Sequence, residues 1–279
     1  MKKTSIALAV TGAVIVAGLG TVPAASAFGS AKAVGLAGGG TTLVGFDPER
    51  PSRASSPQTV TGLVQDTALI GIDYRVQDGE LYGVGNQGGI YVLDARRGKA
   101  VLQDRPRVTL DGSSAYGVDF NPAANALRIV SSNGTNLRVP FATAAAAIVD
   151  GPLTRPAIAP ATGTVPATGV TAAAYTNNDL DATTATTLFV IDTERDQVAI
   201  QSPANAGSTA ATGALGADVS GDIGFDIYSD LRRGKTTKIK AYAVVGSTVH
   251  RVDLLTGAAP AIGKLRVGGV TDLAVALDD

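Results

Sequence analysis

Three aspartates occupy the same place in a repeated pattern of glycine, an apolar residue, aspartate and a second apolar residue. The pattern is Gly-Ile-Asp-Tyr, Gly-Val-Asp-Phe and Gly-Phe-Asp-Ile around Asp73, Asp119 and Asp226. In an open pocket, two or three such carboxylates could act as acid, base or nucleophile on a glycoside. Alternatively, each carboxylate accepts hydrogen bonds from backbone N–H groups of a neighbouring repeat. The repetition favours this structural role, because a glycosidase needs carboxylates in different environments.

A second set of aspartates closes strand-like segments just before a tight turn. An aspartate in this place can accept hydrogen bonds from backbone N–H groups two or three residues further on. We therefore assign a structural turn role to Asp47, Asp94, Asp192 and Asp253. Asp192 comes soon after Tyr175, which marks the start of its repeat, so Asp192 could end a second strand rather than a third.

The loop from Asn177 to Asp181 offers oxygen atoms at alternating positions, as a calcium loop would. An EF-hand loop needs glycine at its sixth position and glutamate at its twelfth. Counted from Asn177, those positions hold Ala182 and Leu188. The spacing favours a polar hairpin loop, and the sequence predicts neither a metal site nor a cofactor.

The composition excludes several kinds of chemistry. The 279 residues include no cysteine and no tryptophan, and the single histidine is His250. Thiolate metal sites, iron–sulfur clusters, a cysteine nucleophile and multi-histidine centres are thereby excluded. No Gly-x-Ser-x-Gly nucleophile motif occurs. The absence of tryptophan also counts against a carbohydrate site built on stacked rings.

The charge pattern gives no sign of a nucleic-acid partner. Lys and Arg number 23 against 24 Asp and Glu, a formal net charge of −1. Phosphate binding needs a concentrated basic patch, so we expect no nucleic-acid partner. The densest basic stretch, Leu231–Lys240, is interpreted as a solvated hairpin loop that runs into a strand.

The hydrophobic pattern has a period of two, which is typical of strands. The glycine–apolar–aspartate pattern recurs, with degenerate copies around Ala174 and Asp272, at intervals of about 46–55 residues, which suits one four-stranded propeller blade per repeat. Residues 270–277 resemble the first strand of a repeat and residues 33–60 the later strands, so the two ends together complete a blade. The sequence predicts an all-β chain with five blades, closed by pairing of the N- and C-terminal strands. A β-sandwich is the alternative, and we expect at most one helical turn in Ala142–Ile148.

The first 27 residues have the pattern of a secretory signal peptide. Lys2 and Lys3 precede an apolar run from Ile6 to Leu19, and Ala25-Ser26-Ala27 forms an Ala-x-Ala cleavage site. The apolar run is too short to span a bilayer comfortably. We expect cleavage after Ala27, no membrane anchor afterwards, and a single secreted domain over residues 28–279.

Several segments together resemble one protein family. They include Leu-Val-Gly-Phe-Asp-Pro at 43–48, Tyr-Gly-Val-Asp-Phe-Asn-Pro at 116–122, Leu-Arg-Ile-Val-Ser at 127–131 and Ala-Tyr-Thr-Asn-Asn at 174–178. The chain resembles the domain-of-unknown-function family 4394 of bacterial exported proteins, from about Leu43 to Ala276. The resemblance implies a propeller-like fold and export, but no activity and no catalytic residues.

These observations favour an exported, monomeric, non-enzymatic propeller. It would bind a small molecule, a glycan or a protein through its channel face or its loops. Two alternatives remain: a glycoside-directed hydrolase that uses Asp73, Asp119 and Asp226, and a structural component of the cell envelope.

Overall fold

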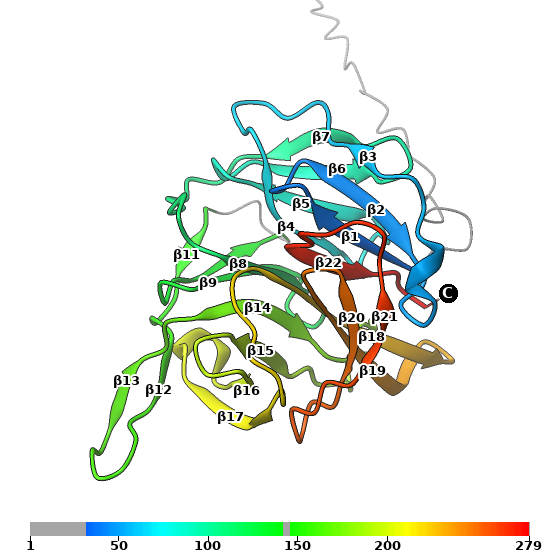
Figure 1. Ribbon diagram of the computed structural model, residues 1–279. Helices are drawn as coiled ribbons and strands as arrows, with labels where there is room; N and C mark the ends of the chain where they lie inside the picture. Colours follow the sequence, from blue (N-terminus) through cyan, green and yellow to red (C-terminus); the bar gives the residue numbers. More distant parts are fainter. Residues whose placement is uncertain (1–31, 142–145, 279) are drawn as a thin grey trace, which may run out of the picture.

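The described residues form five four-stranded sheets arranged around a common centre (Figure 1). The computed structural model describes residues 32–141 and 146–278. Each of the five sheets has four antiparallel strands, so the predicted five-bladed β-propeller is confirmed. The described residues contain no helix that is long and apolar enough to cross a membrane.

Each blade runs from an inner strand at the centre to an outer strand at the rim. The first blade contains β22 (Asp272–Val275), β1 (Ala33–Ala37), β2 (Thr42–Phe46) and β3 (Gln58–Thr59). The second contains β4 (Leu69–Tyr74), β5 (Leu81–Gly85), β6 (Ile90–Asp94) and β7 (Lys99–Asp104). The third contains β8 (Tyr116–Asn121), β9 (Ala126–Ser131), β10 (Asn136–Pro140) and β11 (Ile148–Val149).

The fourth and fifth blades follow the same order. The fourth contains β14 (Val170–Tyr175), β15 (Leu188–Asp192), β16 (Gln197–Gln201) and β17 (Thr209–Ala214). The fifth contains β18 (Ile223–Arg232), β19 (Lys235–Val245), β20 (Thr248–Val252) and β21 (Ala261–Lys264). Two single-turn 3₁₀ helices, η1 (Pro51–Arg53) and η2 (Ala204–Ala206), lie in the connections.

The ring closes through the two ends of the chain, as the repeat pattern predicts. β1 pairs with β22, with Ala33 opposite Val275 and Leu36 opposite Asp272. Closure gives both terminal strands a partner, and β1 is paired on both sides. The leader at 1–27 lies outside the described residues, as do residues 142–145 of the stretch for which at most one helical turn is predicted; Ile148 begins β11.

Glycine begins the repeated pattern because the inner strands of neighbouring blades lie very close together. A methyl group on Gly71 would lie 2.4 Å from Cγ2 of Val118 in the next blade. One on Gly117 would lie 2.5 Å from the backbone nitrogen of Ala173. These separations leave no room for a side chain.

Five apolar clusters fill the space between neighbouring blades. The cluster between the second and third blades contains Tyr82 and Phe120, whose ring centroids lie 5.3 Å apart in edge-to-face contact. Phe141 meets the ring of Phe120 at 4.8 Å in the same manner. The aromatic residues of the repeated pattern therefore belong to the interblade core.

Two local features depart from the simple repeat. An extra hairpin, β12 (Thr154–Pro156) and β13 (Thr164–Pro166), is inserted between the third and fourth blades, and the repeat pattern does not predict it. Asp192 ends the second strand of its blade, whereas Asp94 ends a third strand. The early position of Asp192 is thereby explained.

Candidate functional site

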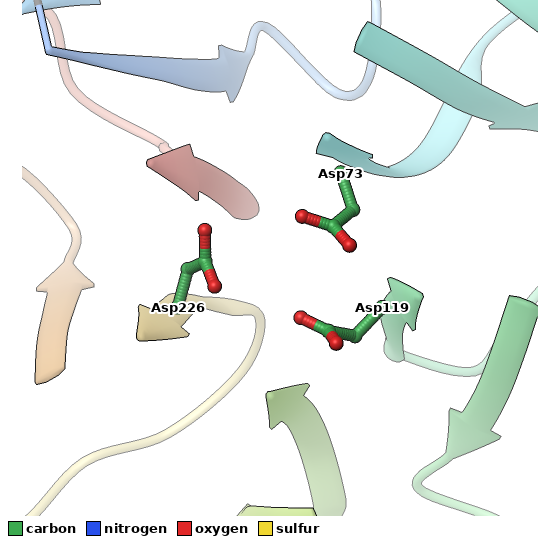
Figure 2. Close-up of side chains that lie close together, drawn as sticks. All are labelled: Asp73, Asp119 and Asp226. Carbon is green, nitrogen blue, oxygen red and sulfur yellow. The ribbon is translucent and has the colours of Figure 1, made fainter. Parts of the chain in front are cut away.

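The three repeated aspartates converge at the centre of the propeller, where their carboxyl groups point toward one another (Figure 2). They come from the inner strands β4, β8 and β18. One carboxylate oxygen of each lies within 4.8 Å of the others. The exposed fractions of Asp73, Asp119 and Asp226 are 4%, 2% and 1%. At the position of these aspartates, the fourth and first blades carry Ala174 and Ala274 instead.

Each of these carboxylates accepts a hydrogen bond from the inner strand of the following blade. Asp73 accepts from Phe120 N at 2.7 Å. Asp119 accepts from Tyr175 N at 3.0 Å. Asp226 accepts from Val275 N at 2.5 Å. The repeated aspartates therefore link consecutive inner strands.

A fourth buried aspartate completes the set from a different place in the pattern. Asp272 stands in β22 where three of the other repeats have glycine and one has alanine, and its Oδ2 accepts a hydrogen bond of 2.8 Å from Ile72 N. In the sequence this residue belongs only to a degenerate copy of the repeat, which predicts no role for it. Its register with Leu36 in β1 is what brings it against β4.

These carboxyl groups form no ion pair with a basic residue, unlike two other aspartates whose side chains are almost fully covered. Asp66 and Asp150 each lie 2.7 Å from an arginine, Arg105 and Arg128 respectively. Among the described residues, no ion pair includes any of the four central aspartates, which are Asp73, Asp119, Asp226 and Asp272. Their charge must therefore be relieved by protonation or by a group outside the chain.

Burial accordingly raises the pKa values of these carboxyl groups. Burial raises the pKa of Asp226 to about 7, against two backbone hydrogen bonds that lower it. Burial, followed by repulsion from a neighbouring carboxylate, raises the pKa of Asp73 and of Asp119 well above 3.8. The cluster therefore retains protons at pH values where exposed aspartates have lost them.

This geometry is ill suited to glycoside hydrolysis. Catalytic carboxylates stand roughly 5–10 Å apart across a space that admits the sugar. Here the oxygens lie within 4.8 Å in a buried cluster, and both oxygens of Asp73 and of Asp226 already accept backbone N–H groups. The arrangement favours a role in holding the blades together.

The turn aspartates accept hydrogen bonds from their own turns. Asp47 accepts from Glu49 N at 2.9 Å, Asp94 from Arg96 N at 3.0 Å and Asp253 from Leu255 N at 3.0 Å. Asp192 accepts from Glu194 N at 3.0 Å.

The carboxylates of the polar loop after β14 also accept hydrogen bonds from backbone N–H groups. Asp179 accepts from Asp181 N and from Thr236 N, both at 2.9 Å. Asp181 accepts from Thr183 N at 2.7 Å. Two of these bonds lie within the loop, and the bond from Thr236 N ties the loop to β19.

A cavity of about 380 Å³ lies at the ends of three consecutive inner strands. Its walls come from the turn after β4, the turn after β8 and the loop after β14. The lining residues are Gln77, Pro122, Ala123, Asn125, Asn177, Asp179, Leu180, Asp181, Ala182, Thr184 and Thr186. From the sequence, only the loop after β14 is a candidate binding segment. The other two walls belong to different repeats, and nothing in the sequence indicates that they lie beside it.

Hydrogen bonds between blades hold the walls of this cavity in place. Gln77 donates to Pro122 O at 2.8 Å, and Arg75 donates to Asn125 at 2.9 Å. On the other side, Asn178 N donates to Ser229 Oγ at 2.9 Å. The cavity is thus built by the propeller rather than by one mobile loop.

Some polar atoms of the cavity residues are left without partners. Among the described residues, Gln77 Oε1 and Thr184 Oγ1 are buried and have no hydrogen-bond partner. Leu180 adds an apolar surface that is 61% exposed. A lining that combines a few polar groups with an apolar side chain is typical of a small-molecule site.

The single imidazole takes no part in either place. His250 lies in β20, where Nδ1 contacts Ala259 O at 2.7 Å. It lines neither the aspartate cluster nor the cavity at the strand ends.

Comparison with known families agrees with the fold and the residue patterns. The model of the family described as Domain of unknown function (DUF4394) matches residues 42–274. The chain belongs to this family. The expected membership is therefore confirmed, and no curated protein matches the chain.

Solved structures give only distant likenesses. An auxiliary nutrient binding protein from Bacteroides thetaiotaomicron VPI-5482 is 12% identical with a TM-score of 0.43, over 89% of this chain and 64% of that chain. The chain thus spans less than two thirds of that protein's length. Glutaminyl cyclase from Myxococcus xanthus is 14% identical with a TM-score of 0.38, over 75% of this chain and 70% of that chain. Likenesses this distant say nothing about the ligand.

Proposed function

We propose that the protein is an exported, non-enzymatic binding module that holds a small polar ligand in the cavity at the strand ends. The observation that carries the proposal is a cavity of about 380 Å³ built from the loops of three consecutive blades. Its volume falls within the range of roughly 300–1,000 Å³ that is usual for small-molecule sites. The export part of the proposal rests on the leader sequence.

The free polar atoms indicate the chemical class of the ligand. Asn177 Oδ1 and Asp181 Oδ2 accept no hydrogen bond from the described residues, while the Nδ2 donors of Asn125 are also unused. Acceptors therefore outnumber donors in the cavity, and the carboxylates make it acidic. A neutral polyol, a small sugar or a small amine supplies matching hydroxyl or ammonium donors.

The test is a thermal-shift screen of residues 28–279 with polyols, mono- and disaccharides and small amines, with and without Ca²⁺. We expect a rise in Tm with at least one of the first three classes. Asn125→Asp keeps the acceptor for Arg75 but replaces the cavity's amide donors with an oxygen. Gln103→Glu, on the exposed strand β7, makes the same change of charge elsewhere.

A shift that Asn125→Asp reduces for a polyol or sugar, or increases for an amine, supports the cavity as the site, provided that Gln103→Glu leaves it unchanged. An unchanged shift in both variants overturns it. Hydrolysis of glycosides by the wild-type protein that disappears in Asp119→Asn would instead support the hydrolase. Export is tested separately by N-terminal sequencing of the secreted protein, which should begin at Phe28.

A further inference from the structure

In the fifth blade, β18 and β19 form a hairpin that is longer than the next strand, β20. β18 and β19 pair along their lengths up to Arg232 and Lys235, and the hairpin extends outward from the blade (Figure 1). β20 covers β19 only from Ala241 to Val245. Within residues 32–141 and 146–278, no strand pairs with the other side of residues 237–240. This part of β19 is an open strand edge.

An apolar groove lies beside this open edge. It has a volume of about 550 Å³ and is lined by residues 239–241 of β19, residues 251–255 at the end of β20, Ala258 and Pro260. Ile239 and Leu255 are 40% and 73% exposed. A strand edge next to apolar pockets is the arrangement by which proteins bind extended peptides as an added strand.

The hairpin is strongly basic although the whole chain carries a net charge of −1. Its exposed basic residues are Arg232, Arg233, Lys235, Lys238 and Lys240. Asp230 and Asp253 are the acidic residues closest in sequence to this segment and to the groove. The excess of positive charge favours an acidic partner.

The hairpin already binds carboxylates from elsewhere in the chain. Leu231 N donates to Asp278 Oδ2 at 2.6 Å, and Thr236 N donates to Asp179 Oδ2 at 2.9 Å. Both amides lie beside the hairpin's tip, where its strand register shifts. Acidic side chains are thus the groups that satisfy this hairpin's free N–H donors.

Lysines on an open edge also serve to prevent unwanted pairing between copies of a protein. That protective role does not require the adjoining groove or the exposed Ile239 and Leu255. We propose that the open edge of β19 at residues 237–240 binds an acidic, extended segment of a partner protein as an additional strand. This interaction is separate from the small-ligand cavity.

The test uses residues 28–279 and a short fluorescent peptide of alternating glutamate and valine. We expect the peptide to bind, measured by fluorescence anisotropy, and to shift the backbone amide resonances of residues 237–240 in NMR spectra. N-methylation of alternate peptide nitrogens keeps the charge but blocks strand pairing, so it should weaken binding by at least about tenfold. Equal binding of the N-methylated peptide would show that only charge matters and would overturn strand addition.

Charge-reversal variants test the basic side chains. Lys238→Glu combined with Lys240→Glu should weaken peptide binding by at least about tenfold, because both attractions become repulsions. Lys264→Glu, exposed in β21 of the same blade, should change it less than about twofold. Failure of the acidic peptide to bind the wild-type protein at low salt would reject the proposal. So would sedimentation showing that a second copy of the chain covers this edge.

The cavity ligand provides an independent readout. The double charge reversal should leave any thermal shift by the small ligand unchanged, since neither lysine lines that cavity. Failure of peptide binding and failure of the proposed small-ligand function are therefore distinguishable.

Discussion

The carboxylate of Asp272 accepts a hydrogen bond of 2.8 Å from the backbone N–H of Ile72, which lies 200 residues earlier in the chain. Asp272 lies in β22, the inner strand of the blade made from both chain ends, and Ile72 lies in the inner strand of the next blade. This bond therefore joins the closing blade to its neighbour. Asp73 and Asp226 make equivalent links elsewhere around the ring.

Removal of the Asp272 carboxylate should destabilise the propeller at its closure. Asp272→Ala leaves the buried N–H of Ile72 without an acceptor, at a cost of about 1–3 kcal/mol. Asp218→Ala, at an exposed site, should change the free energy of unfolding by less than about 0.5 kcal/mol. Urea unfolding monitored by far-UV circular dichroism measures both. Equal stability of the two variants would show that the Asp272–Ile72 bond contributes nothing to closure.

The stability of the protein should fall as the pH rises through the neutral range. Burial raises the folded-state pKa of Asp226 to about 7, from an ordinary value of 3.8, and raises those of Asp73 and Asp119 as well. The folded chain therefore binds more protons than the unfolded chain above about pH 4. The stabilisation is complete below the unfolded pKa and is lost as the pH rises through the folded values.

The expected slope is up to about 1.4 kcal/mol per pH unit for each group that titrates. Urea unfolding between about pH 4.5 and 8.5 measures it. A free energy of unfolding that rises with pH across this range would contradict the raised pKa values. The exposed turn carboxylate of Asp253, whose pKa is lowered by backbone hydrogen bonds, acts in the opposite sense and at lower pH.

The two variants Asp119→Asn and Asp226→Asn should differ although they make the same chemical change. Only one oxygen of Asp119 accepts a backbone N–H, so an asparagine can keep that bond and turn its amide toward the neighbouring carboxyl groups. Both oxygens of Asp226 accept N–H groups, from Ile227 and Val275, so an amide there must face a donor.

We therefore expect Asp119→Asn to be as stable as the wild type or more stable near pH 8, because it removes a buried charge. Asp226→Asn removes a buried charge as well but turns its amide against an N–H donor, so it should be about 1–3 kcal/mol less stable than Asp119→Asn at the same pH. Chemical unfolding of both variants under identical conditions measures the difference. Equal losses would mean that hydrogen-bond geometry does not distinguish the two sites.

Glycine at the start of the repeat should be required by space alone. Gly71→Ala places a methyl group 2.4 Å from Val118 Cγ2 and 2.7 Å from Asp272 Oδ2. Overpacking of this kind costs about 1–3 kcal/mol. Gly112→Ala meets no atom within 4 Å and should be nearly neutral, so a comparison of the two Tm values isolates the contact between inner strands. A neutral Gly71→Ala would mean that the inner strands can move apart.

The alternation of apolar residues and the spacing of the glycine–apolar–aspartate pattern determine much of this fold without any coordinates. The period of two indicates which face of each strand is buried. The repetition at about 50 residues indicates one blade per repeat, because each blade must bury the same faces against its neighbours. The pairing of β1 with β22 follows from the same pattern, since the end segments are complementary parts of one blade. The basic stretch Leu231–Lys240 belongs to a hairpin as expected, but it is not a long loop, because only residues 233 and 234 lie between β18 and β19.

Only the tertiary structure determines which groups from other blades the patterned residues contact. The pattern places Asp73, Asp119 and Asp226 at equivalent positions, but only the ring brings one oxygen of each within 4.8 Å of the others. None of the three forms an ion pair with a basic residue among those described. The cavity takes its walls from three repeats, so no single stretch of sequence contains it. Local periodicity is a property of neighbouring residues, whereas proximity across the ring depends on how five blades close. The sequence therefore determines the blade, and the closed ring determines the chemistry between blades.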